Sequence, residues 1–535
     1  MENRNGLLVL CVALVTASLG AVEWGQAPNG EFWNGCATRF IFAPAFGFKA
    51  VEGAEKYVYE VTDDWHRVQT FEATSPTASL KPIWDKLPVG YVTVVCRGIA
   101  ADGTARGEAG RRTFWKKSAF DDSYPPAERT FSHAYMRVMD AYFNMDQTKY
   151  LIRHGRPDPD YYLSGYPSKM LSSQITALVS YANRLSGNHL PLRDKYLGVA
   201  KRAADYLIAE SVPAGKPLEF FTRTYANGGE YGRFVGQEDR IMLVYPARCG
   251  DAFVKLSEAT KDAKYLAAAE RIAATYLKLQ REDGTWFLLQ NAETGKEYEP
   301  NRLQPQPVIE FFELLFRVTG RAMYREAADR AFAFIEKGPM RDWDWEGQFE
   351  DVKPASARWS NQTKHAACAT ATYLLKRFPG DAARLAQAEE LVRFGEDQFV
   401  EWTPPYGDRA APNGRDDGSW DYFCRPYSRW VTPCALEQYQ CYYPIDASAD
   451  RFINTFLTLW RVTKKAEYLA KAKALGAAAT RMQEADGFIN TWWIRGVERN
   501  DDRYHTWVNC MLATARALDN LANAEREVAS AGEGR

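Results

Sequence analysis

The stretch GQEDRIMLVYPARCGDAFVKLSEATKDAKYLAAAERIAATYLKLQREDGTW, residues 236–286, decides the fold. Apolar residues recur at helical spacing in two runs, 238–259 and 261–280, with Lys261-Asp262 at the break between them. The stretch therefore predicts a helical hairpin, with the acidic residue Asp239 at the start of its first helix.

The same hairpin pattern recurs over residues 125–525. A tyrosine follows the break between helices at a constant distance in KDAKY (261–265), GRAMY (320–324) and KKAEY (464–468). The spacing predicts helices over 130–146, 168–185, 191–211, 238–259, 261–280, 305–319, 321–336, 361–378, 381–399, 446–463, 465–483 and 504–524. Five consecutive hairpins, with the first and last helices left to pair with each other, predict a mainly α fold, an (α/α)6 toroid.

Short β-rich segments separated by turn signals precede the helices. They are 56–61, 66–73, 91–100 and 111–117. They predict a small β-sandwich over residues 22–120. The run VEGAEKYVYEV followed by LPVGYVTVVCRG resembles a fibronectin type III module.

The N-terminus, residues 1–21, has the features of a secretory signal peptide. Arg4 precedes the apolar run Gly6–Leu19, which is too short to span a bilayer. We therefore expect a secreted or periplasmic protein with no membrane span. At the other end, residues 526–535 are predicted to form a disordered tail.

The composition excludes some classes of binding partner and cofactor. The net charge of -1 gives no basic footprint, so nucleic acid is not expected as a partner. The cysteines show no C-x-x-C spacing, and we expect neither a metal nor another cofactor. The sequence leaves the oligomeric state open.

The long connections between hairpins hold most of the unusual residues. In a toroid the connections 212–237, 281–304, 337–360, 400–445 and 484–503 fall at one end of the ring, and loops of this length are usually functional. Aromatic rings suit sugar faces, and arginines pair with carboxylates, so the loops favour a uronic-acid-containing oligosaccharide or polysaccharide. The predicted substrate-binding residues are Arg223, Tyr225, Arg233, Trp343, Trp345, Trp420, Arg425, Arg429, Trp492 and Arg495.

Three carboxylates are candidates for catalysis: Asp239, Glu346 and Asp351. Cleavage of a glycosidic bond needs a proton donor and a second carboxylate that activates water or acts as the nucleophile. Glu346 and Asp351 lie in the acidic, aromatic segment WDWEGQFEDV (343–352), where mutual repulsion would push one carboxylate towards its protonated form. The residues do not choose between these two.

Two histidines, His365 and His505, are expected at the starts of inner helices. With Tyr504 they could abstract a proton for β-elimination, as in toroid polysaccharide lyases, or transfer one at a sugar carbon, as in the N-acylglucosamine 2-epimerase class. Alternatively, each would only hydrogen-bond a loop or a substrate hydroxyl.

The segment QEDRIMLVYPARCGDAFVKLSEATKDAKYLAAA resembles the region around the catalytic aspartate of the unsaturated uronyl hydrolases, glycoside hydrolase families 88 and 105. Asp239, Ile241-Met242, Pro246 and Lys261–Tyr265 match in order, and the resemblance implies that Asp239 is the general acid. The next hairpin departs from that pattern, with NRLQPQPVIEFF (301–312) in place of a glycine-rich, Trp-containing stretch. The layout of a β-domain before a six-hairpin toroid also resembles the β-glucuronidases of family 154.

Together these features predict a secreted glycoside hydrolase that cleaves a uronic-acid-containing glycan, in particular an exo-acting β-glucuronidase or related uronidase. A polysaccharide lyase and a non-catalytic glycan-binding protein are the alternatives.

Overall fold

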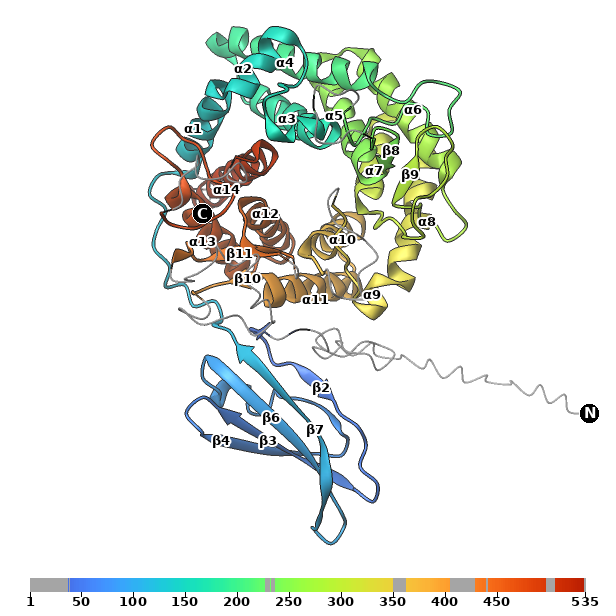
Figure 1. Ribbon diagram of the computed structural model, residues 1–535. Helices are drawn as coiled ribbons and strands as arrows, with labels where there is room; N and C mark the ends of the chain where they lie inside the picture. Colours follow the sequence, from blue (N-terminus) through green and yellow to red (C-terminus); the bar gives the residue numbers. More distant parts are fainter. Residues whose placement is uncertain are drawn as a thin grey trace, which may run out of the picture.

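A β region and a ring of helices follow one another along the chain (Figure 1). The computed structural model describes residues 37, 39–226, 231, 236–349, 362–404, 429–438, 441–496 and 506–533. The predicted signal peptide lies outside the described residues, and the secreted location stays a prediction.

The β region is built on a five-stranded sheet of order β1-β7-β6-β3-β4. Its strands are β1 (Arg39–Phe40), β3 (Lys56–Asp63), β4 (Val68–Ala73), β6 (Gly90–Ile99) and β7 (Ala105–Lys116). A two-stranded sheet pairs β2 (Ala45–Gly47) with β5 (Thr77–Ser79), and a short 3-10 turn, η2 (Trp84–Lys86), precedes β6. Alternate residues of β3 are buried, as expected for a strand with one face on a core. A small β unit is thus confirmed, whereas its fibronectin type III character stays a prediction.

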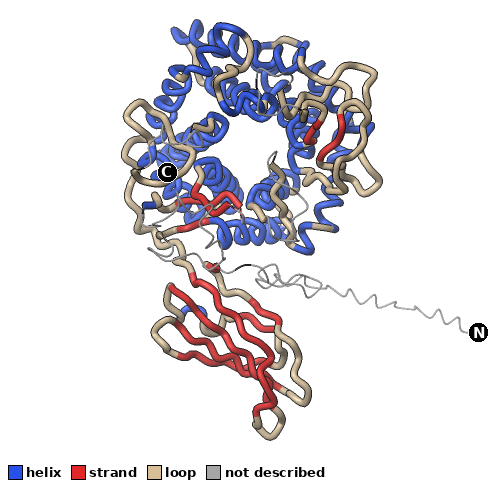
Figure 2. The backbone as a smooth tube through the Cα atoms, viewed as in Figure 1, coloured by secondary structure: helices blue, strands red, loops and turns tan. Residues whose placement is uncertain are grey.

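Twelve helices of the described residues form two concentric layers (Figures 1 and 2). The inner layer is α3 (Pro167–Ala182), α5 (Val244–Thr260), α7 (Gln306–Thr319), α10 (Lys364–Arg377), α12 (Asp446–Thr463) and α14 (Val508–Glu533). The outer layer is α1 (Phe131–Asn144), α4 (Leu190–Ala209), α6 (Ala263–Leu279), α8 (Ala322–Lys337), α11 (Ala382–Phe399) and α13 (Ala466–Met482). Each inner helix contacts the next, α14 contacts α3, and α1 packs on α14, so the ring closes. This arrangement confirms the predicted toroid.

The breaks within hairpins explain the recurring tyrosine. Lys261 and Lys464 end their helices in the left-handed conformation (φ 60° and 59°), as Gly320 does (φ 70°). The next helix then begins at once, and its first-turn tyrosines Tyr265 and Tyr324 are buried. The repeated motif therefore marks a tight turn followed by an anchoring ring.

The structure differs from the prediction at the start of α5. The helix begins at Val244, not near 238, because Arg240–Met242 form strand β8, which pairs with β9 (Leu289–Asn291). Asp239 therefore precedes a strand and does not start a helix. The competing backbone hydrogen bonds come from a segment about fifty residues away, which local spacing does not reveal.

The C-terminal helix also differs from expectation. Helix α14 runs to Glu533 and includes most of the segment 526–535, for which a disordered tail is predicted. Glu527 forms an ion pair with Arg461 at 2.8 Å, and Glu525 forms one with Lys473 at 3.1 Å, so helices α12 and α13 both hold this end. None of the helices in the described part of the chain is long and apolar enough to cross a membrane.

Short elements complete the connections. They are α2 (Asp146–His154), η3 (Tyr162–Gly165), η4 (Gly187–His189), α9 (Pro339–Asp342), β10 (Val400–Glu401), β11 (Cys434–Gln438) and β12 (Cys441–Pro444). Strands β10, β11 and β12 form a small sheet within the connection from α11 to α12.

A buried charge cluster joins the β unit to the ring. Arg39 and Lys117 both pair with Glu401, at 3.2 Å and 3.0 Å, and none of the three side chains is more than 4% exposed. Asp397, at the end of α11, accepts the backbone N–H groups of Ile41 and Phe42. Such a cluster is stable only while every charge keeps its partner.

We expect Gly250→Ala to destabilise the ring. Gly250 of α5 packs against the fully buried Phe311 of α7, and an added methyl group would overlap that ring. The overlap should cost about 1–3 kcal/mol of unfolding free energy. Gly198→Ala on α4 is the matched control, because nothing lies within 4 Å of its added methyl group. The control should instead gain up to about 1 kcal/mol from helix propensity. Urea unfolding of both variants makes the comparison, and equal stability would contradict the close α5–α7 packing.

Candidate functional site

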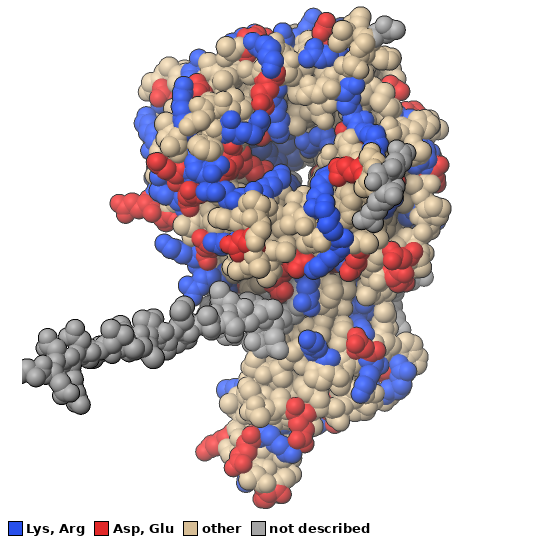
Figure 3. Space-filling view, turned by 180° about the vertical axis from the view of Figure 1, so that it is seen from behind, with Lys and Arg blue, Asp and Glu red and all other residues tan. Residues whose placement is uncertain are grey.

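A cavity of about 460 Å³ occupies the centre of the ring. Its wall is made by residues of all six inner helices and by the loop that precedes α10. From behind, the ring is hollowed at its centre, with Lys and Arg side chains around the hollow (Figure 3). This is the site that the toroid builds from sequence positions hundreds of residues apart.

The inner helices all begin at the same end of the ring. Each one follows a connection between hairpins, and the connections before α5, α7, α10, α12 and α14 are the long ones that the sequence predicts. Aligned peptide dipoles place partial positive charge at helix N-termini. These termini therefore add partial positive charge to this end of the cavity, beside charged side chains of both signs in its wall.

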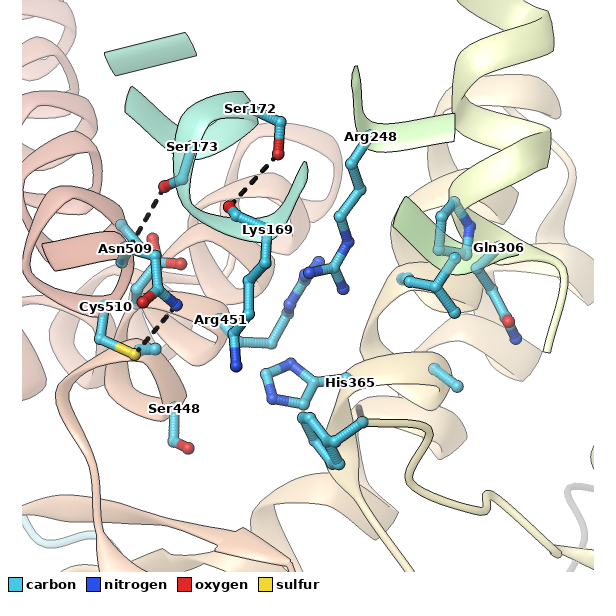
Figure 4. A pocket seen from close by; sticks show the side chains of 18 of the residues that line it. Lys169, Ser172, Ser173, Arg248, Gln306, His365, Ser448, Arg451, Asn509 and Cys510 are labelled. Carbon is cyan, nitrogen blue, oxygen red and sulfur yellow. Dashed lines mark hydrogen bonds between the residues drawn. The ribbon is translucent and has the colours of Figure 1, made fainter. Parts of the chain in front are cut away.

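Three cationic side chains approach His365 inside the cavity (Figure 4). Lys169 comes from α3, Arg248 from α5 and Arg451 from α12. Neither Arg248 nor Arg451 forms an ion pair with a carboxylate of the described residues.

His365 is an uncharged imidazole at neutral pH. Burial is the largest cause that holds the pKa of His365 well below its usual range, and the charges of Lys364 and Arg451 add to it. The His365 side chain lines the cavity and is half-buried. An imidazole in this form can accept a proton or a hydrogen bond from a ligand.

Lys364 supports this wall from behind. Its ammonium group is fully buried and donates to the Glu437 carbonyl oxygen of β11 at 2.6 Å and to Ser448 Oγ of α12 at 2.5 Å. A cation at the first turn of a helix opposes the helix dipole, so this position is electrostatically costly. The two hydrogen bonds fix β11 and α12 against the start of α10, next to His365.

Glu346 is the carboxyl group of the cavity best suited to donate a proton. Burial, and then the neighbouring Asp344 carboxylate, raise the pKa of Glu346 from 4.5 to about 7. The group is therefore partly protonated near neutral pH. Glu346 lies in the loop after α9, which also supplies Gln348 and Phe349 to the cavity.

Several buried oxygens of the wall have no protein hydrogen-bond partner among the described residues. They are Gln304 Oε1, Gln306 Oε1 and Asn509 Oδ1. Buried acceptors are rarely left unsatisfied, and ligand hydroxyl groups would satisfy them. The wall thus offers acceptors for hydroxyls, cations for an anion and one proton donor.

Of the predicted catalytic residues, the structure brings Glu346 and His365 together in the cavity. Asp239 does not line it. Its carboxylate accepts hydrogen bonds from the Asn291 side chain and from Tyr298 at 2.7 Å. Asp351 and His505 lie outside the described residues.

The predicted substrate-binding residues that the structure describes lie outside the cavity wall. Arg223 donates to the Glu210 and Glu238 carbonyl oxygens, and Arg429 donates to the Arg495 carbonyl oxygen. The aromatic residues Tyr225, Trp343, Trp345 and Trp492 are buried at 7% exposure or less. Arg233, Trp420 and Arg425 lie outside the described residues.

The cations of the inner helices are not among the site residues predicted from the sequence. Lys169, Arg248 and Arg451 lie in the first or second turn of their helices, each on the side that faces the cavity. Their positions could have identified them. An inner helix of a ring is covered by its neighbours, so a charged residue on its inward face must point into the central cavity.

No family model and no curated protein sequence matches the chain. Solved structures do align. A family 76 α-mannanase of Bacteroides thetaiotaomicron aligns with a TM-score of 0.50 and 12% identity over 75% of this chain and 97% of that one. A D-mannose isomerase aligns with a TM-score of 0.51 and 12% identity over 75% and 100%. A heparin-specific unsaturated glucuronyl hydrolase aligns with a TM-score of 0.45 and 12% identity over 74% and 98%.

The likeness to the mannanase and the isomerase establishes the fold. This chain has the (α/α)6 toroid found in those carbohydrate-active enzymes.

We expect Glu346→Gln to change how stability depends on pH. The folded protein binds the Glu346 proton more tightly than the unfolded chain, so the wild type loses stability as pH rises from about 4.5 to about 7. The glutamine variant has no such loss. Its unfolding free energy should exceed that of the wild type by about 1 kcal/mol at pH 8, and by little at pH 4.5, after solvent screening.

Thermal unfolding across this range measures the difference. The exposed Glu282 of the α6–α7 connection provides the control variant Glu282→Gln, which should follow the wild type. Parallel curves for wild type and Glu346→Gln would contradict the raised pKa.

Proposed function

We propose that this protein hydrolyses a glycosidic bond of a uronic-acid-containing glycan in the central cavity of its toroid. The observation that carries the proposal is Glu346, a carboxyl group whose pKa of about 7 keeps it partly protonated near neutral pH, in one cavity with Arg248 and Arg451, which form no ion pair within the described residues. The alignment with a toroid glycoside hydrolase, the family 76 α-mannanase, supports a glycan as substrate.

In this mechanism Glu346 acts as the general acid. It protonates the glycosidic oxygen as the bond to the anomeric carbon breaks. Glu310 of α7 supplies the second carboxylate, because it lines the same cavity, is exposed to it and forms no ion pair within the described residues. The Glu310 carboxylate would activate the attacking water or bond to the anomeric carbon.

Exo action on a chain end, as in a β-glucuronidase, is the form of the reaction that we propose. Six helices surround the cavity, and its volume of about 460 Å³ lies towards the lower end of the range for small-molecule sites. A small site ringed by helices admits the end of a chain more readily than its middle.

The first test is an incubation with saturated uronate oligosaccharides and with unsaturated ones made by a lyase, following new reducing ends and ultraviolet absorbance. We expect new reducing ends, with flat absorbance on saturated substrate. Glu346→Gln should lower kcat by roughly 100-fold to 10,000-fold, because it removes the proton donor.

Asp239→Asn is the matched comparison, since it removes the carboxylate that the uronyl hydrolase resemblance implies as the acid. With Glu346 as the acid, this variant should keep kcat within about threefold, well below the loss of a general acid. A full loss in Asp239→Asn with activity retained in Glu346→Gln would reverse the assignment. Absence of new reducing ends on every substrate would exclude hydrolysis.

A second function, β-elimination, is favoured by a specific observation. Elimination needs the uronate carboxylate neutralised and a base that removes the neighbouring proton. Arg248 and Arg451 could neutralise the carboxylate, and His365 is an uncharged imidazole beside them.

His365→Gln separates this function from hydrolysis. A lyase would show rising absorbance that disappears in His365→Gln and persists in Glu346→Gln, whereas a hydrolase would show the opposite dependence in its reducing-end assay. Binding without either signal would indicate a non-catalytic glycan-binding protein, or an isomerase that changes neither quantity.

A further inference from the structure

Two arginines of the cavity have the properties of a carboxylate-binding pair. Arg248 is exposed to the cavity, and its guanidinium group lies 5.6 Å from the ring centre of Tyr245. Arg451 is half-buried, and its Nε atom is buried without a hydrogen-bond partner among the described residues. Both act on the same imidazole, His365, and both point towards it (Figure 4).

Three other cations of the cavity have interactions of their own. Lys255 forms an ion pair with Asp251 at 2.5 Å, Lys169 lies over the rings of Tyr166 and Trp507, and Arg516 together with Arg451 favours the charged form of Asp450. Arg248 and Arg451 form no ion pair within the described residues, and they are the two arginines that point towards His365.

We propose that Arg248 and Arg451 form a clamp for the carboxylate of the bound sugar and give the site its selectivity for acidic over neutral sugars. That the ligand is a sugar rests on the proposed function. A guanidinium group binds a carboxylate through two parallel N–H···O bonds, and two such groups can enclose one carboxylate from two sides. His365, being uncharged, adds no further positive charge but can hydrogen-bond the same group.

The clamp also orients the ligand. Arg248 and Arg451 belong to α5 and α12, whereas Glu346 belongs to the loop that leads into α10. A sugar held by its carboxylate at the clamp turns its other groups towards the remaining walls, where Gln306 and Asn509 offer acceptor oxygens that have no partner among the described residues.

The test measures binding affinity while the charge is removed from the protein, from the ligand, or from both. Isothermal titration calorimetry with glucuronate and with its uncharged methyl ester compares two ligands of nearly the same shape. The protein variants are Arg248→Gln, Arg451→Gln and, as the matched control, Lys255→Gln, which removes a paired cation of the same cavity.

The wild type should bind glucuronate roughly tenfold to hundredfold more tightly than the ester. Each arginine variant should lose roughly tenfold or more on glucuronate and less than about threefold on the ester. Lys255→Gln should keep the preference of the wild type for the acid. Circular dichroism verifies that each variant is folded.

Three outcomes would overturn the clamp. One is equal affinity of the wild type for the acid and the ester. Another is an equal loss on both ligands in the arginine variants, which would mark a structural role. The third is binding of inorganic sulfate as tight as that of glucuronate at the same ionic strength, which would mark a general anion site. None of these outcomes would exclude cleavage of a glycosidic bond, which the reducing-end assay tests separately. Conversely, a working clamp in a protein that cleaves nothing would reject the hydrolase and keep the clamp.

Discussion

Closure of the helical ring is the constraint on which the other features depend. Helix α14 contacts both α3 and α12 and packs on α1, so the end of the chain returns to its beginning. Once the ring is closed, six parallel inner helices must begin at one end, and their polar first turns must face one another. The convergence of Lys169, Arg248 and Arg451 on the cavity follows from this closure, because no local segment contains more than one of these residues.

Features that depend on local spacing could be predicted from the sequence, whereas features that depend on closure of the ring or on distant pairing could not. Hairpins depend on spacing within about forty residues, so the apolar periodicity and the breaks at Lys261 and Lys464 were enough to predict twelve helices and a toroid. Asp239 was expected at the start of a helix, but it precedes a strand, because the distant strand β9 pairs with the segment that follows it.

The site was only partly accessible to the same reasoning. Glu346 and His365 stood out as unusual residues at the ends of loops, and both line the cavity. The loop tryptophans suggested sugar stacking, but Trp345 is fully buried, since long loops need apolar anchors of their own. Arg248 and Arg451 were overlooked because a charge on a helix face normally indicates solvent.

The Glu401 cluster gives the β unit a part in the geometry of the cavity. Glu401 belongs to β10, which pairs with β11 at Cys434, and β11 carries Glu437 into the cavity wall. Arg39 and Lys117, from the two ends of the β unit, thus brace one side of the cavity through two short strands. A chain shortened to its ring would keep every cavity residue and yet lose the support of that wall, so the β unit and the ring form one structural body.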